Sequence, residues 1–324
     1  MLIGAEDPSQ IVFTSGATEA NNWVLSPPLP PQGRGGRGER GAYISPFEHS
    51  AVREPALARG FELLKNTGYK IDLPEQANFI SVMSVNNEIG ARWDPREFRK
   101  LPSPFGGRGA GGEGPVKLHS DITQQVGKLP TDVTGLDYAS FSAHKFYGPK
   151  GVGALYIADD PPTAFMLGGE QEQGRRAGTL NVPGIVGMGA AAAIAMDELE
   201  VNLEKAATLR SLFLDELAAK SADELMIHGG ENPSPYILSL SFKGVEGETL
   251  LIEADQAGFA LSAGAACSSR SSEPSHVLTA LGLTDDWLRG TIRISFGRFN
   301  TEDATLALAK LLKRTVNRMR GMRL

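Results

Sequence analysis

Short apolar runs and helix-like patterns alternate along the first half of the chain. Runs typical of buried strands lie at residues 11–14, 42–45, 79–85 and 116–120, and two more flank the polar segment 143–151. Helical patterns begin near Ser15 and Ala51. Such an alternation is typical of an α/β fold, in which helices cover the faces of a sheet.

The second half of the chain has a different pattern. One long helix is expected from Pro183 to about Lys220, and it forms a natural hinge. Strands at 235–242 and 291–296, helices at 246–257 and 275–281, and a closing helix from Thr301 to Arg320 follow. Because 324 residues exceed what one core usually holds, we expect a large domain over residues 1–201 and a smaller α+β domain over 202–324.

Composition narrows the class of protein. The net charge of −6 gives no overall attraction to nucleic acid or anionic membranes, and the chain shows neither a signal peptide nor an apolar run of spanning length. A cytoplasmic location is therefore expected. The single cysteine, Cys267, excludes an internal disulfide and a multi-cysteine metal site within one chain. The Pro/Gly/Arg-rich stretches 27–41 and 102–115 are expected to be surface loops, with RNA binding as a minor alternative.

Polar side chains follow the predicted strands, at the sheet edge where ligands bind in open α/β folds. They are His49, Asn87, Asp121, Gln124 and Lys145. Lys145 stands where a strand runs out, and a partly desolvated lysine there can condense with an aldehyde. The alternatives are a solvated loop lysine, and capping or turn roles for His49, Asn87 and Asp121.

Three further segments carry candidate chemistry. Residues 15–18 combine a glycine turn, hydroxyl groups and a helix start, which suits a phosphate, although plain helix capping is the alternative. Residues 168–181 form a polar, glycine-punctuated loop that is too rich in charges and hydroxyls for a simple linker. Cys267 lies among Gly, Ala and Ser, which indicates an exposed reactive thiol, against the alternative of a buried inert one.

Taken together, these stretches resemble the cysteine desulfurase family, in particular its NifS/IscS-like branch. The family consists of class V aminotransferases with the fold of type I pyridoxal phosphate enzymes. The resemblance rests on nine segments that stand in the family's order: TSGATEANN, FEHSAV, VNNEIG, HSDITQQVGKLP, SFSAHKFYGPKGVGALYI, GRRAGTLNV, AGAACSS, EPSHVLTALGL and RISFGRF. It implies a large, mainly parallel sheet of the seven-stranded type, a smaller domain that carries the cysteine loop, and a homodimer.

The resemblance also implies roles for individual residues. Lys145 would bind pyridoxal phosphate covalently, Asp121 would face the ring nitrogen, Gln124 the ring hydroxyl, and His49 would stack on the ring. The phosphate would be held by Thr18, Ser142, His144 and the backbone of Ala17, with Thr179 reaching the phosphate of the neighbouring subunit. Asn87 and Arg293 would bind the substrate carboxylate.

The implied reaction removes sulfur from L-cysteine and leaves L-alanine and a persulfide on Cys267, for an iron–sulfur scaffold or another sulfur acceptor. Cys267 could also ligate an iron–sulfur cluster transiently. Two departures stand out: the N-terminal segment of the family is missing, so we expect a truncated chain, and Ala263 replaces the usual serine. A selenocysteine lyase or aminotransferase of the same fold, and a catalytically silent homologue that acts as a binding partner, are the alternatives.

Overall fold

The computed structural model describes residues 2–26, 41–101, 116–159, 161–217, 224–263 and 274–321. Both Pro/Gly/Arg-rich stretches, apart from Gly41, and the loop with Cys267 lie outside these residues. The chain divides into two compact units. Unit 1 comprises Met1–Val85 and Trp93–Leu199, and unit 2 comprises Asn86–Arg92 and Glu200–Leu324. The sequence-based division after residue 201 placed the segment Asn86–Arg92 in the large domain. The structure assigns this segment to unit 2.

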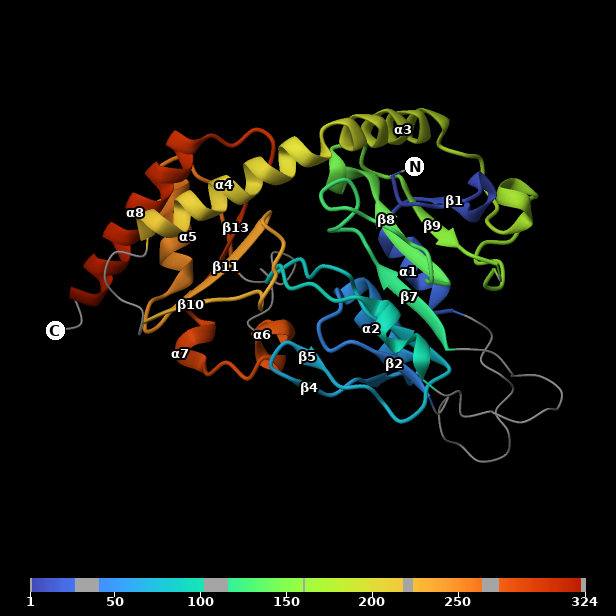
Figure 1. Ribbon diagram of the computed structural model, residues 1–324, viewed down its shortest axis with the longest axis horizontal. Helices are drawn as coiled ribbons and strands as arrows, with labels where there is room; N and C mark the ends of the chain where they lie inside the picture. The colour runs from blue at the N-terminus through green and yellow to red at the C-terminus, as the bar shows by residue number, and fades with distance from the viewer. Residues whose placement is uncertain are drawn as a thin grey trace. The chain divides into compact units, whose positions relative to one another are not determined.

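Unit 1 is built on a seven-stranded sheet (Figure 1). The strand order is β1 (Ile11–Thr14), β9 (Gly153–Ile157), β8 (Tyr138–Ser142), β7 (Lys117–Asp121), β6 (Phe79–Ser81), β2 (Ala42–Ile44) and β3 (Glu62–Leu63). Only β9 runs against the other strands, because it pairs antiparallel with both β1 and β8. The mainly parallel sheet expected from the sequence is therefore confirmed, and the carboxyl ends of β1, β2, β6, β7 and β8 share one edge.

Within the described part of unit 1, three α-helices and several shorter elements accompany the sheet. The α-helices are α1 (Ala17–Val24), α2 (Ser50–Ala58) and α3 (Val182–Asp197), and the 3₁₀ turns are η1 (Pro8–Gln10), η2 (Pro95–Lys100), η3 (Ala143–Phe146) and η4 (Gln171–Gly174). A small hairpin joins β4 (Asn66–Thr67) to β5 (Lys70–Ile71). Asn181 caps the start of α3, since its side chain accepts a hydrogen bond from the backbone N–H of Gly184 at 3.1 Å.

The core beneath α1 fixes this helix on the sheet. Trp23 is fully buried with Val12, Val24, Tyr138 and Leu155, and its indole N–H donates to the carbonyl of Thr163 at 2.8 Å. A buried indole needs such an acceptor, because an unpaired N–H would carry a desolvation penalty. The N-terminus of α1 is therefore held at the carboxyl end of β1 by packing along the whole helix.

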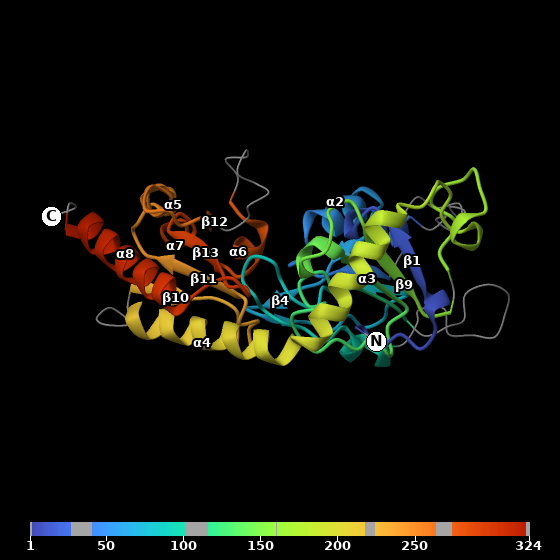
Figure 2. The ribbon, with the colours of Figure 1, turned by 90° about the horizontal axis from the view of Figure 1, so that it is seen from above.

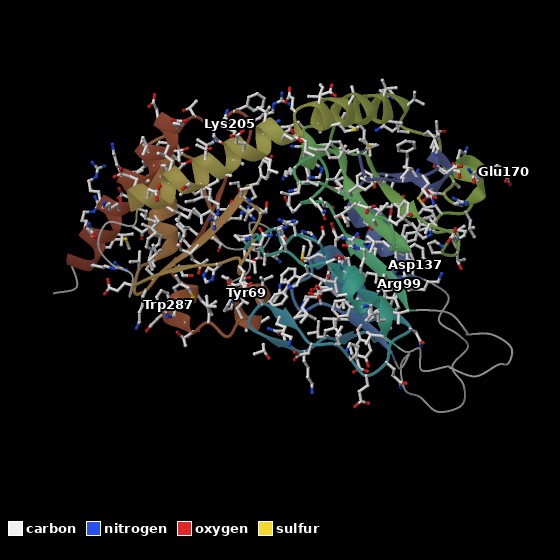
Figure 3. All side chains as sticks on the ribbon, viewed as in Figure 1. Tyr69, Arg99, Asp137, Glu170, Lys205 and Trp287 are labelled. Carbon is white, nitrogen blue, oxygen red and sulfur yellow. The ribbon has the colours of Figure 1, made fainter. Side chains whose placement is uncertain are left out.

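The opposite edge of the sheet is tied by an ionic network around Asp137. Its carboxylate accepts a hydrogen bond from Arg99 at 2.9 Å and from the backbone N–H of Leu118 at 2.8 Å, and Lys117 lies 3.2 Å away. Arg99 and Asp137 lie next to each other in Figure 3. Because this network joins η2 to the starts of β7 and β8, it supports the sheet from the edge away from the candidate site.

Unit 2 has an antiparallel sheet in the order β10 (Leu225–Ile227), β11 (Ile237–Phe242), β13 (Thr291–Ser295) and β12 (Ser262–Ala263). Its helices are α4 (Leu199–Leu217), α5 (Gly247–Gln256), α6 (His276–Ala280), α7 (Asp285–Leu288) and α8 (Glu302–Gly321). Figure 2 shows α4 and α8 side by side, and the ammonium group of Lys313 donates to the carbonyl of Glu216 at 3.1 Å between them. The expected α+β pattern is present.

The prediction of one long helix from Pro183 to about Lys220 is wrong. The structure has two helices, and the backbone N–H of Glu198 closes α3 by donating to the carbonyls of Ile194 and Met196. The apolar spacing continues through this break, so the pattern alone did not reveal it. Among the described residues, no single helix is long and apolar enough to cross a membrane; only α3 and α4 taken together, bent at the break, meet that test by length and composition.

Candidate active site in unit 1

Lys145 lies in a tight turn at the carboxyl end of β8. The 3₁₀ turn η3 begins directly after Ser142, and Tyr147 ends it with a left-handed backbone, φ 68°. A non-glycine residue in this region costs energy and is often found beside functional groups. The N–H of Gly148 donates to the carbonyl of Ala143 at 2.9 Å and closes the turn. Lys145 is half-buried there, so a lysine at the end of a strand is confirmed, within a 3₁₀ turn and not an open loop.

Asp121 lies at the same edge, at the carboxyl end of β7. In the parallel register Asp121 stands opposite Ser140 of β8, five residues before Lys145. Its side chain is buried and accepts two hydrogen bonds, from the amide of Asn21 at 2.8 Å and from the backbone N–H of Thr123 at 3.0 Å. The second bond is the turn-forming contact that the sequence left open as an alternative. The acid and the lysine thus share one edge of the sheet.

The carboxyl end of β1 and the start of α1 form an anion cradle next to β8. The backbone N–H of Ala17 donates to the hydroxyl of Ser142 at 2.7 Å. Gly153 lets the strands approach this turn, because a Cβ there would lie 2.6 Å from Cα of Gly16. The N–H groups of the first helical turn, including that of Thr18, have no carbonyl within the helix to bond to. Thr18 itself is exposed, so its hydroxyl and these N–H groups can meet an anion.

Positive charge gathers near this cradle. His144, in η3, has its pKa lowered, first by burial and then by the charges of Lys145, Lys150 and Lys128. A cluster of cations that disfavours one more proton on an imidazole favours a doubly charged phosphate in the same place. The cradle and the cation cluster therefore agree on an anionic ligand.

His49 and Gln124 complete the sequence-predicted set in unit 1. His49 caps α2, since its Nδ1 accepts from the backbone N–H of Ala51 at 3.1 Å, which is the capping role that the sequence left open. This bond assigns the proton of a neutral ring to Nε2. The side-chain oxygen of Gln124 accepts from the ammonium group of Lys128 at 3.0 Å. Stacking on a ring and binding of a ring hydroxyl stay predictions for these two residues.

Thr179 lies exposed in the glycine-punctuated loop, which is anchored to α1 by an ion pair. Arg176 donates two hydrogen bonds to Glu19, at 2.8 and 3.1 Å, and the backbone N–H of Ser15 donates to the same carboxylate at 2.8 Å. Burial alone raises the pKa of Glu19, but the hydrogen bonds from Arg176 and Ser15 outweigh it and the pKa is lowered. Glu19 and Arg176 were not among the predicted site residues.

Two buried titratable groups next to Asp121 were also missed. Glu48 is fully buried and accepts from the backbone N–H of Met83 at 2.7 Å. Burial, and then the charge of Asp121, raise the pKa of Glu48 well above its usual value. His119 lies between Ser81 and Ser140, with both ring nitrogens 2.8 Å from a hydroxyl, and burial lowers its pKa to about 4. In the sequence, only the place of Glu48 next to His49 in the FEHSAV segment indicated that it lies near the site.

The described residues of unit 1 fit pyridoxal phosphate. The anion cradle suits the phosphate group, the half-buried Lys145 suits the aldehyde, and a buried carboxylate with fixed orientation suits a protonated ring nitrogen. These three features lie after the ends of β1, β8 and β7, at one edge of one sheet. These residues thus match the phosphate, the aldehyde and the ring nitrogen of the cofactor.

Unit 2 holds the pair predicted for the substrate carboxylate. Arg293, on β13, donates to the carbonyl of Asn87 at 2.8 Å and to the hydroxyl of Ser262 at 3.2 Å. These two contacts fix the orientation of the planar guanidinium. The hydroxyl of Ser275 donates to the buried Glu88 at 2.5 Å and fixes the same backbone segment. Cys267 lies outside the described residues.

The profile of the class-V aminotransferase family matches residues 1–308. A solved structure described as a NifS-like protein superposes with a TM-score of 0.78 and 31% sequence identity, covering 96% of this chain and 83% of the other. Fold and profile match thus define a class-V aminotransferase.

Relatives within that class specify it further. A cysteine desulfurase IscS from Enterobacter sp. is 40% identical over 346 aligned residues, which cover 99% of this chain and 80% of the relative. A solved structure described as SspA in complex with cysteine has a TM-score of 0.67 and 27% identity, and covers 91% of this chain and 83% of the other. The chain belongs to the cysteine desulfurase family, as its sequence motifs predicted.

Proposed function

We propose that the protein uses pyridoxal phosphate to remove sulfur from L-cysteine, giving L-alanine and a persulfide on Cys267. The observation that carries this proposal is the placement of Lys145 and Asp121 at one edge of the unit 1 sheet, beside the cradle formed by Ala17 and Ser142. When bound, pyridoxal phosphate supplies an electron sink for the bonds at the substrate α-carbon. The chain itself supplies binding, orientation, proton transfer and the sulfur nucleophile.

The residues of unit 1 hold the cofactor in this proposal. The amine of Lys145 binds its aldehyde, and Asp121 pairs with its ring nitrogen. Gln124 binds the ring hydroxyl and His49 stacks on the ring. The phosphate is held by Thr18, Ser142, His144 and the N–H of Ala17, with Thr179 of the neighbouring subunit. The proposed large domain, residues 1–201, contains all of these positions.

The residues of unit 2 hold and attack the substrate. Asn87 and Arg293 bind the carboxylate of L-cysteine, for which the forked guanidinium is well shaped and which its hydrogen bonds to the carbonyl of Asn87 and the hydroxyl of Ser262 hold in a fixed orientation. The thiolate of Cys267, in the proposed small domain of residues 202–324, attacks the substrate sulfur. The bond between that sulfur and its carbon breaks, carbon takes up the electron pair and a proton, and L-alanine leaves. The structural neighbour described with bound cysteine supports this substrate over an amino acid without sulfur.

We also propose a homodimer that passes sulfur to an iron–sulfur scaffold or another acceptor protein. Thr179 is exposed at the surface of unit 1. The neighbouring helix α3 carries several exposed apolar side chains, which suits a subunit contact. They include Val182, Val186, Ile194 and Met196.

Visible absorption of the purified protein with added pyridoxal phosphate tests the cofactor assignment. We expect an absorption band from the lysine-bound cofactor, which Lys145→Ala abolishes and Lys70→Ala, at an exposed lysine, leaves intact. A colourless wild-type protein with added cofactor supports the catalytically silent homologue and contradicts the proposal.

Products formed from L-cysteine test the nucleophile. With a reductant, equal amounts of L-alanine and sulfide are expected, and Cys267→Ser should abolish both. Persistent alanine formation in this variant, or turnover of L-selenocysteine alone, points to the selenocysteine lyase alternative. Transfer of the amino group to an oxo acid points to the aminotransferase.

A further inference from the structure

Two serines of unit 2 flank residues 264–273, the cysteine stretch, which contains Cys267. Ser262 stands just before this stretch, and Ser275 stands just after it. The structure describes both serines, and the side chain of each makes a hydrogen bond toward the substrate-carboxylate pair, Asn87 and Arg293, or its immediate neighbour. The contacts of the two serines therefore show what holds each end of the stretch.

The unit 2 sheet places Ser262 next to Arg293. Strand β12 pairs antiparallel with β13, and Ser262 is directly opposite Arg293 in the register. Side chains that stand directly opposite each other lie on the same face of a sheet, with their Cβ atoms about 4.5–5.5 Å apart. The guanidinium donates to the hydroxyl of Ser262 at 3.2 Å. The strand before the cysteine stretch thus holds one member of the pair.

Ser275 reaches the other member of the pair through Glu88. The hydroxyl of Ser275 caps α6, because it accepts from the backbone N–H of Leu278 at 3.3 Å. A hydroxyl has a single hydrogen, and this one is donated to a carboxyl oxygen of Glu88 at 2.5 Å. Glu88 is only 4% exposed. Removal of the hydroxyl would therefore take a donor from a buried carboxyl group, which is costly.

The turn that contains Glu88 also carries Asn87. The side-chain oxygen of Asn86 accepts from the backbone N–H groups of Glu88 and Ile89, at 2.8 and 2.9 Å, and closes the turn. Arg293 donates to the carbonyl of Asn87 at 2.8 Å. Asn87 thus lies between two fixed points, since its own carbonyl is bound to β13 and the next side chain is bound to the start of α6.

We propose that Ser262 and Ser275 are positioning residues that tie the two ends of the cysteine stretch to the substrate-carboxylate pair. Ser262 orients the guanidinium of Arg293. Ser275, through the neighbouring carboxyl group, holds the turn that carries Asn87. This inference rests on the proposed function and deepens it, because recognition of the substrate carboxylate then depends on two hydroxyl groups that touch no substrate.

L-Alanine and ethylamine differ only in the carboxylate group, so their binding to the holoenzyme tests the role of Ser275. The change in the visible spectrum of bound pyridoxal phosphate gives a dissociation constant for each amine. Ser275→Ala should raise the constant for L-alanine about 5- to 20-fold and leave that for ethylamine within about twofold of the wild type. In turnover, the same variant should raise KM for L-cysteine more than it lowers kcat.

Matched variants separate the hydrogen bond to Glu88 from the capping of α6. Thr301→Ala removes a similar contact at the start of α8, where the hydroxyl of Thr301 accepts from the backbone N–H of Ala304 at 3.3 Å, and should leave L-alanine binding unchanged. Ser275→Thr keeps a hydroxyl and should retain the wild-type affinity. Glu88→Ala should resemble Ser275→Ala, and the double variant should bind no more weakly than either, because both changes break the same hydrogen bond.

Ser262→Ala tests the other end of the cysteine stretch. It removes the hydroxyl that accepts from Arg293, so the dissociation constant for L-alanine should rise about 3- to 5-fold and that for ethylamine should not change. The smaller factor follows from the longer hydrogen bond. Ser211→Ala is the control, because the hydroxyl of Ser211 donates only to Asp215, at 3.5 Å on the exposed surface of α4.

Alkylation of Cys267 in the apoprotein tests the tie without cofactor or activity. Cys267 is the single cysteine of the chain, so iodoacetamide reports on it alone. Release of one end of the stretch should raise the alkylation rate about two- to fivefold in Ser262→Ala and in Ser275→Ala. The rate should stay at the wild-type value in Thr301→Ala.

The outcomes separate this inference from the proposed function. A wild-type holoenzyme that binds neither L-alanine nor L-cysteine contradicts the proposed function, whereas the alkylation rates still decide whether the serines hold the stretch. If the wild type prefers L-alanine to ethylamine and Ser275→Ala keeps that preference in full, Ser275 has no positioning role. Should Ser275→Ala fail to fold, Ser275→Gly provides the comparison, because glycine at a cap costs little. Equal alkylation of Cys267 in the wild type and both serine variants overturns the tie.

Discussion

The ion pair between Glu19 and Arg176 offers the sharpest test of how unit 1 is held together. Arg176→Met removes both hydrogen bonds, at 2.8 and 3.1 Å, and keeps much of the volume of the side chain. The two side chains are only 10% and 16% exposed. Exposed ion pairs contribute about 0–1 kcal/mol, and breaking a fully buried pair costs about 3–5 kcal/mol. We therefore expect the free energy of unfolding to fall by about 2–3 kcal/mol.

Equilibrium urea unfolding followed by tryptophan fluorescence measures this loss, because Trp23 and Trp93 both lie in unit 1. Glu19→Gln should cost slightly less, since a side-chain oxygen remains for the N–H of Ser15. In a double-mutant cycle the coupling energy should be about 1–2 kcal/mol. The control is Arg53→Met at the exposed pair with Glu54, where about 0.5 kcal/mol or less is expected.

The pH dependence gives the pair a second signature. Because the pKa of Glu19 is lowered in the folded protein, its contribution is present above the ordinary carboxyl pKa and disappears as pH falls below it. The stability difference between wild type and Glu19→Gln should therefore narrow as the solution is acidified below about pH 4.5. The reasoning would be refuted if the stability difference between wild type and Glu19→Gln stayed constant into this acid range. It would also be refuted if the losses in free energy of unfolding of Arg176→Met and Glu19→Gln simply added in the double variant.

Three further changes probe other parts of the chain. Trp23→Ala empties a fully buried site and should lower the free energy of urea unfolding by about 3–5 kcal/mol, whereas Trp23→Phe should lose less. Asp137→Asn breaks the ionic network with Arg99 and should cost about 2 kcal/mol in thermal unfolding; a loss equal to that of the exposed control Asp132→Asn would contradict this. Burial lowers the pKa of His228 from 6.5 to about 4, so the unfolded chain binds a proton first and stability falls as pH drops through this range. His228→Asn should flatten that part of the stability curve measured by urea unfolding, and an unchanged slope would contradict it.

The strand-end residues were predictable because the sheet is mainly parallel. Asp121 and Lys145 each follow a recognisable apolar run, and parallel strands bring their carboxyl ends to one edge. No knowledge of long-range packing is needed for this step. The start of α1 was equally clear, because a glycine turn with hydroxyl groups before a helical pattern is encoded within a few residues.

The residues that support the site were not predictable in the same way. Asn21 meets Asp121 across 100 positions of sequence, and Arg176 meets Glu19 across 157. No local pattern records such pairings. In the sequence, nothing distinguishes Glu48 from an exposed polar residue. Its burial follows only from the arrangement of β2 and β6 in the folded protein. Strands β3, β4 and β5 have two residues each, which is too short for an alternation to be recognised.

Helix α1 explains why these unpredicted contacts concentrate where they do. It has eight residues, too few for a stable helix on its own, so its position depends on what its side chains reach. Trp23 fixes it in the core, Glu19 fixes the loop with Thr179, and Asn21 fixes Asp121. Thr18 and Asn21 are three positions apart and therefore lie close together on the helix surface. An anion bound at the start of α1 and the carboxylate at the end of β7 are consequently oriented by the same rigid turn, which links the two ends of the candidate cofactor site through one short element.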